Sequence, residues 1–101
     1  MTHYAIVSIT PSSEDWIPGY LEAVTPLVAK HGGKYLARTA SHERIEGTGP
    51  NPALRAIIEW PSEEAMQAWY DDPAYQPHKE SRLAGSDSDF FSVAGKDDFA
   101  S

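Results

Sequence analysis

The sequence contains no cysteine, which excludes disulfides, thiolate nucleophiles and cysteine metal sites. This absence is compatible with a reducing compartment, and we expect a cytoplasmic protein. Basic residues are also few, with 8 Lys and Arg against 15 Asp and Glu and a formal net charge of -7. Because no segment clusters the basic residues, we expect no nucleic-acid partner.

Long hydrophobic runs are missing as well. Nowhere do enough apolar residues follow one another to span a membrane, so we expect no membrane association. Residues 1–10 lack the basic leader and apolar core of a secretion signal. What is present is ordinary for a globular protein, with 41% hydrophobic and 23% charged residues. We predict one domain over residues 1–95 and a polar tail over residues 96–101.

The first third of the chain predicts a strand followed by a helix. Tyr4–Ile9 is rich in β-branched residues and runs into a Pro-Ser-Ser turn. Ser12 and Asp15 resemble a capping box, which places the helix start there, and the pair Gly32-Gly33 predicts its end. Between them, apolar side chains recur at helical spacing: Trp16, Ile17, Tyr20, Leu21, Val24, Leu27 and Val28.

The next segments predict a hairpin. Lys34–Ala40 alternates as a strand does, and residues 42–46 could extend that strand after a bulge. Residues 47–52, rich in glycine and proline, form a loop that leads into a third strand at Ala53–Trp60.

The last third predicts helical segments and a final strand. Ser62 is a suitable N-cap, and Asp72-Pro73 restarts a helix that continues to about residue 83 and closes at Gly85. Asp89–Ala94 is the fourth strand. The order β-α-β-β-α-β is that of the α+β ferredoxin-like fold, with a four-stranded antiparallel sheet.

The first and third strands are apolar on both faces, so both faces of the sheet need cover. The helices cover one face and leave the other face uncovered. By standard strand dimensions the uncovered face is a rectangle of about 350 Å². That area lies within the range of the largest apolar patch on ordinary monomers, so the area alone does not decide between a monomer and a dimer. The residue types favour a twofold homodimer through the open face over a monomer.

Three segments resemble a bacterial family known only as a domain of unknown function in the dimeric α+β-barrel superfamily. They are His31–Arg38 (HGGKYLAR), Arg55–Pro61 (RAIIEWP) and Ala68–Tyr75 (AWYDDPAY). The resemblance covers nearly the whole chain and departs at Thr39-Ala40, where glycines usually follow the arginine. It implies a dimeric α+β barrel. Because that superfamily includes cofactorless monooxygenases, muconolactone isomerases and haem-degrading enzymes, it does not fix an activity.

Arg38 is the first candidate site residue. By strand alternation it shares a face with Leu36 and Ala40, and a covered arginine needs an anion. One reading pairs it with Glu59 on the neighbouring strand as a structural ion pair. The other gives it a substrate carboxylate or enolate, which its guanidinium would bind bidentately as an anion anchor.

His42 is a candidate catalytic base on the same predicted strand, with Arg38 stabilising the enolate that forms. The alternative is an exposed hairpin histidine. No pair of histidines has metal-ligand spacing, so we expect neither a metal nor a cofactor.

Large amphipathic side chains could line a cleft between helices and sheet, and most are also explained as core. The predicted ligand-binding residues are Tyr35, Arg38, Glu59, Trp69, Tyr75 and His78. Arg82 shares a helix side with Tyr75 and His78, although pairing with Glu80 on a solvated face is the simpler account.

Three functional readings remain. The first is a homodimer that binds a small carbonyl or acidic aromatic metabolite between sheet and helices, with cofactorless oxygenation or isomerisation as fitting activities. The second is a non-enzymatic dimeric module whose polar residues are structural. An accessory subunit that offers its acidic surface to a basic partner is a third class, based on net charge alone.

Overall fold

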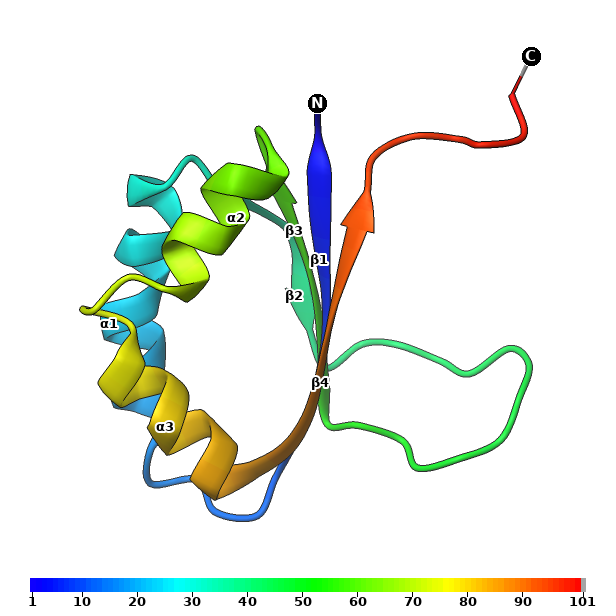
Figure 1. Cartoon of the computed structure of the whole chain (residues 1–101). Helices are drawn as coiled ribbons and strands as arrows, with labels where there is room; N and C mark the ends of the chain where they lie inside the picture. The colour runs from blue at the N-terminus through cyan, green and yellow to red at the C-terminus, as the bar shows by residue number, and fades with distance from the viewer. Residues whose placement is uncertain (101) are drawn as a thin grey trace.

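The computed structural model describes residues 1–100 as one sheet with helices on one of its faces (Figure 1). In chain order the elements are β1 (His3–Pro11), α1 (Ile17–Lys30), β2 (Lys34–Thr39), β3 (Leu54–Trp60), α2 (Glu63–Tyr70), α3 (Gln76–Gly85) and β4 (Ser86–Ala94). The strands are ordered β2-β3-β1-β4 and every neighbouring pair is antiparallel. This confirms the predicted ferredoxin-like fold, with the second helical region divided into α2 and α3.

Two of the predicted helix boundaries are confirmed. Ser62 caps α2, since its hydroxyl accepts a hydrogen bond from the backbone N–H of Ala65 at 3.0 Å. Helix α1 ends in a Schellman motif, in which the N–H groups of Gly32 and Gly33 donate to the carbonyls of Ala29 and Val28. Gly32 has a φ of 83°, which a residue without Cβ adopts at little cost.

Two predicted helix starts are wrong. Ser12 and Asp15 form no capping box, because α1 begins only at Ile17. The backbone N–H of Ser12 instead donates to the carbonyl of Gly85 at 2.8 Å, which ties the turn before α1 to the end of α3. Asp72 does not begin a helix either. Its carboxylate accepts the backbone N–H of Ala74 in a local turn, and α3 starts at Gln76.

Two strand boundaries also differ from the prediction. Residues 42–46 add nothing to β2, which stops at Thr39 and leads into a long connection to β3. Strand β4 begins at Ser86 instead of Asp89, because Ser86 and Asp87 pair with Pro11 and Thr10 of β1. The polar Ser-Asp-Ser-Asp sequence hid this pairing, since it lacks the apolar alternation that predicts a strand.

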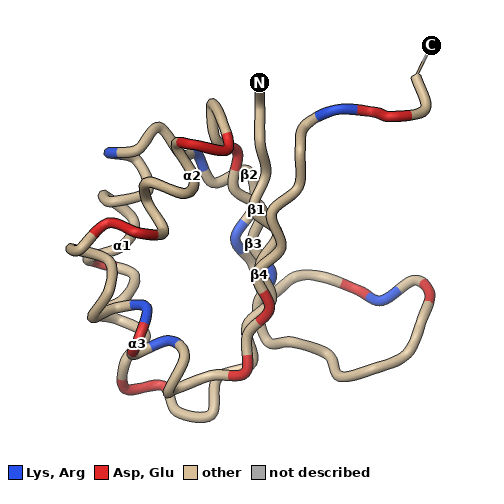
Figure 2. Tube along the Cα trace, viewed as in Figure 1, with Lys and Arg blue, Asp and Glu red and all other residues tan. Residues whose placement is uncertain are grey.

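The connection between β2 and β3 lies on the side of the sheet opposite the helices (Figure 1). Arg44 organises it, donating to the backbone carbonyls of Thr48, Gly49 and Pro50. Acidic residues are spread over the helices, this connection and the C-terminal segment (Figure 2). None of the helices in residues 1–100 is both long enough and apolar enough to cross a membrane.

An aromatic cluster forms the core at one end of the sheet. Trp60 at the end of β3 pairs in register with His3 at the start of β1. The ring of Trp69 from α2 lies with its centroid 5.3 Å from that of Trp60 and 4.3 Å from that of Tyr75. All three aromatic side chains are fully buried. This packing joins the helices to the sheet at the Trp60 end.

Gly33 is predicted to tolerate no side chain. A Cβ there would lie 2.6 Å from Val28 and 2.7 Å from the Trp60 ring, so Gly33→Ala forces core atoms apart. We expect a loss of about 1–3 kcal/mol in the free energy of unfolding, measured by urea denaturation. The matched control is Gly19→Ala within α1, where a Cβ meets nothing within 4 Å. That change should stabilise by about 0.5–1 kcal/mol. Equal effects would contradict the packing described.

Asp72 connects the turn between α2 and α3 to the end of α1. The ring Nε2 of His31 donates to its carboxylate at 2.8 Å, and Lys30 lies 3.5 Å away. The bond from His31, followed by the N–H of Ala74 and the charge of Lys30, lowers the pKa of Asp72 to about 2.

This pKa predicts a pH-dependent contribution to stability. A carboxyl whose pKa is depressed on folding stabilises the folded state above its unfolded pKa of 3.8, and that contribution disappears as the pH falls toward 2. Asp72→Asn should therefore lower the melting temperature at pH 5 to 7, and the difference from wild type should shrink below pH 4. Asp71→Asn, which removes a carboxylate bonded only to the exposed Gln67 amide, is the control. A constant difference across pH would contradict the assignment.

Candidate ligand-binding cavity

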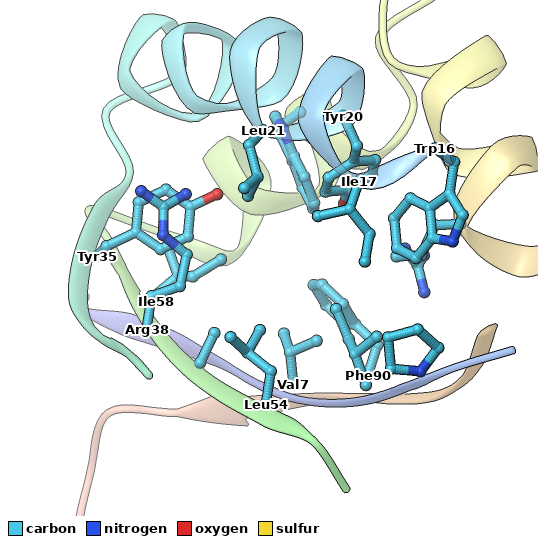
Figure 3. Close-up of a pocket in the computed structure, with 15 residues that line it drawn as sticks. Val7, Trp16, Ile17, Tyr20, Leu21, Tyr35, Arg38, Leu54, Ile58 and Phe90 are labelled. Atoms are coloured by element: carbon cyan, nitrogen blue, oxygen red, sulfur yellow. The ribbon is translucent and has the colours of Figure 1, made fainter. Parts of the chain in front are cut away.

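A cavity of about 120 Å³ lies between α1 and the sheet, at the end opposite Trp60. Side chains from α1 and from the strands project into it from both sides (Figure 3). Its lining is mostly apolar and aromatic: Val7, Ile9, Pro11, Trp16, Ile17, Tyr20, Leu21, Tyr35, Leu54, Ala56, Ile58, Trp69 and Phe90, with Arg38 and Arg82. A more open hollow of about 260 Å³ lies between the β2–β3 connection and the sheet and is lined largely by polar residues.

A β-bulge at Leu36 decides where Arg38 lies. Tyr35 pairs with Ile58 of β3 and Ala37 pairs with Ile57, so Leu36 is an extra residue without a partner. After the bulge, Arg38 pairs with Ala56 and shares the helix-facing side of the sheet with Tyr35. The prediction that Arg38 shares a face with Leu36 is therefore wrong, because strand alternation was counted across the extra residue.

Arg38 is held at the β2 edge of the cavity. Its Nη1 donates to the Thr25 hydroxyl of α1 at 2.9 Å, and its guanidinium lies over the Tyr35 ring, 3.9 Å from the centroid. The predicted pair with Glu59 does not form. Glu59 pairs in register with Lys34 and Tyr4, so it lies on the opposite face of the sheet.

Arg82 lies at the β4 edge of the same cavity. It is 3% exposed, and its Nη1 donates to the hydroxyl of Ser88 at 2.6 Å. Burial opposes its charge, the nearby phenols of Tyr75 and Tyr20 favour it, and the pKa of the guanidinium is raised. The description of Arg82 as part of a solvated helix face is therefore wrong. Tyr75, two helical turns earlier, is fully buried, and that spacing was the signal for a buried Arg82.

Tyrosine hydroxyls add further polar groups, from the lining residues Tyr20 and Tyr35 and from Tyr75 behind them. The hydroxyls of Tyr20 and Tyr75 are hydrogen-bonded to each other at 2.9 Å. Burial, followed by the proximity of Tyr75, raises the pKa of Tyr20. Burial also raises the pKa of Tyr35, although the neighbouring Arg38 opposes this. Tyr20 and Tyr35 are therefore neutral near pH 7, and their hydroxyls can donate hydrogen bonds. Tyr20 belongs to the large amphipathic side chains that the sequence interpretation considered for a cleft, but it was not among the predicted ligand-binding residues.

The predicted site residues separate into two groups. Tyr35, Arg38 and Trp69 line the cavity, and Tyr75 is buried with its hydroxyl on Tyr20. The two histidines are not among the lining residues: His42 follows the end of β2, and His78 lies half-buried on α3. The structure therefore does not bring His42 and Arg38 together in the cavity. Within residues 1–100, no three His, Asp or Glu side chains form a group that could hold a metal ion.

A family model described as "Domain of unknown function (DUF1330)" matches residues 2–96 of the chain. The chain belongs to this family. The resemblance inferred from the HGGKYLAR and AWYDDPAY segments is thus confirmed, and the cavity described here lies within the matched part of the DUF1330 domain. A search of curated proteins finds no match.

Several solved structures share the fold of this DUF1330 domain. A protein of unknown function from Rhodopseudomonas palustris has a TM-score of 0.78 at 17% identity, covering 95% of this chain and 83% of its own. SnoaB, a cofactor-independent oxygenase from Streptomyces nogalater, has a TM-score of 0.67 at 15% identity, with 99% and 98% covered. A dimeric ferredoxin-like protein of unknown function from Jannaschia sp. CCS1 has a TM-score of 0.70 at 14% identity, with 93% and 99% covered. At these identities the likeness establishes the fold alone.

Proposed function

We propose that this protein is a homodimer that binds a small carbonyl or acidic aromatic metabolite in the cavity between α1 and the sheet. The observation that carries the proposal is the lining: apolar side chains and aromatic rings surround a space with a guanidinium at each of two opposite sheet edges. An apolar pocket with few convergent polar groups is the usual form of a small-molecule site.

The size of the cavity limits the ligand. An apolar cavity of about 150 Å³ in another protein holds one benzene molecule. The 120 Å³ found here therefore suits a single ring or a chain of similar volume. Larger polycyclic ligands would require α1 to move away from the sheet.

The polar groups suit an anionic ligand. Arg38 and Arg82 are positively charged, and the neutral phenols of Tyr20 and Tyr35 donate hydrogen bonds, so all four favour negative charge in the cavity. Among residues 1–100, no histidine or carboxylate lines the cavity. A ligand acidic enough to be ionised near neutral pH therefore suits it better than one that needs a strong base.

An enzymatic role follows if the bound anion reacts. Donors that stabilise an enolate or phenolate support cofactor-independent oxygenation, the activity given for the structurally similar SnoaB. Isomerisation is less well supported, because His42, the proposed base, is not among the cavity-lining residues. A non-enzymatic binding module uses the same cavity, and product formation separates the two roles.

The open face of the sheet supports the homodimer. Apolar side chains on it meet across three strands, since Ile6 of β1 pairs with Ile57 of β3 and with Phe91 of β4. Phe91 is 61% exposed and Val93 is 44% exposed. A second copy packed on this face would bury these side chains, and a twofold axis would place equivalent patches against each other.

The homodimer is tested by native mass spectrometry. Phe91→Glu places a charge in the open face and should convert a dimer to a monomer, because a buried unpaired carboxylate is strongly unfavourable. Leu83→Glu is the matched control on α3, where Leu83 is 55% exposed, and it should stay dimeric. A monomeric wild type, or a dimeric Phe91→Glu variant, would contradict the open-face dimer.

The cavity is tested with benzyl alcohol, a neutral single-ring probe. We expect a dissociation constant in the millimolar range, which corresponds to a binding free energy of about -4 kcal/mol for its eight non-hydrogen atoms. Binding is measured from ¹H–¹⁵N correlation spectra. Shifts should concentrate at cavity residues such as Tyr20 and Leu54. Ala56→Leu narrows the cavity from the sheet side and should abolish these shifts, whereas Ala53→Leu outside the lining should preserve them. Unchanged spectra at saturating probe would reject the cavity as a ligand site.

A further inference from the structure

We propose that Arg82 is the residue that binds the acidic group of the ligand, so that the protein selects single-ring monocarboxylates over neutral rings. This inference rests on the proposed function, since it assumes that the cavity holds a ligand. It differs from the sequence interpretation, which gave the role of anion anchor to Arg38.

The first reason is the burial of Arg82 without a counter-ion. Its side chain is 3% exposed, yet within residues 1–100 no carboxylate lies within ion-pair distance of its guanidinium. The hydrogen bond that it donates goes to the neutral hydroxyl of Ser88. A guanidinium has five N–H donors, and a buried positive charge is stabilised further by an opposite charge beside it. A ligand carboxylate in the adjoining cavity would supply the missing negative charge.

The second reason is the orientation of the Arg82 side chain. Ser88 pairs in register with Ile9, a residue of the cavity lining, so the bond to Ser88 holds the guanidinium over the helix-facing side of β4. The hydrogen-bonded phenols of Tyr20 and Tyr75 lie near it. The carboxylate would therefore meet an oriented guanidinium, which binds two oxygens in one plane.

Arg38 is the weaker anchor because its guanidinium already has partners within the protein and is exposed to solvent. Its side chain is exposed, stacks on Tyr35 and donates to Thr25. Attraction between exposed charges is screened by water and salt, whereas a buried pair is screened much less. Arg38 is on the edge strand β2, and Arg82, a residue of α3, is bonded to Ser88 of the opposite edge strand β4. These two strands are about three strand spacings or ~14 Å apart. A ligand ring therefore lies between them with its acidic group toward Arg82.

The test compares benzoate with benzamide, its uncharged analogue of nearly the same shape, on the full-length protein at pH 7. Dissociation constants are measured by ¹H–¹⁵N titration. Benzoate should bind at least about 10-fold more tightly, the effect of one charge-assisted hydrogen bond. Arg82→Met should reduce this preference to within about 2-fold and leave benzamide binding within about 3-fold. Arg38→Met, the matched control, should retain a preference of more than about 5-fold.

Each other outcome overturns the proposal, and the outcomes are distinguishable. Equal binding of benzoate and benzamide to the wild type rejects an acid anchor but keeps the cavity as a ring-binding site. Loss of the preference in Arg38→Met and not in Arg82→Met moves the anchor to Arg38. Binding of neither probe rejects the proposed function as well. If Arg82→Met does not fold, Ser88→Ala replaces it, and an undiminished preference in that variant overturns the role of the oriented guanidinium.

Discussion

The packing of Trp69 against Trp60 and Tyr75 is the interaction on which the rest of the structure depends. It joins the helix layer to the sheet at the end where β1 begins and β3 ends, and it buries three large rings completely. At the other end the strands carry smaller side chains, such as Val7 and Ala56, which do not fill the space beneath α1. The bulky rings hold the helix layer away from the sheet, and the smaller side chains of the strands leave a cavity under α1.

The electrostatics of that cavity differ from those of the molecule as a whole. The chain carries a formal charge of -7, and its acidic residues are distributed over the helices and loops (Figure 2). In the described part of the chain, two guanidiniums and no carboxylate line the cavity. An anion would therefore receive no long-range attraction from the surface and would be stabilised only after it enters. Without long-range attraction an anion would associate slowly. Its binding would then depend on how well its shape and charge fit the cavity.

The sequence was sufficient to predict which helices and strands form. It was not sufficient to predict on which face of an element a given side chain lies. The number and order of the strands, the helix end at Gly32 and the cap at Ser62 were predicted correctly, whereas two strand boundaries and two helix starts were not. The side on which Arg38 lies depends on a bulge, which is a property of the pairing between two strands and leaves no local signal. The burial of Arg82 depends on how α3 packs against β4. The polar sequence of α3 gives little hydrophobic periodicity, so the spacing from the aromatic Tyr75 was the signal available for it.

The bulge at Leu36 also governs how members of the family can be compared. A relative lacking one residue in β2 would align well with this chain in sequence, yet its arginine would lie on the open face of the sheet and not in the cavity. Identity at this column would then mean different surroundings, because one arginine would border the cavity and the other would lie on the open face of the sheet. Transferring a role for Arg38 between homologues therefore requires the pairing register of β2 and β3, and the presence of the arginine alone is insufficient.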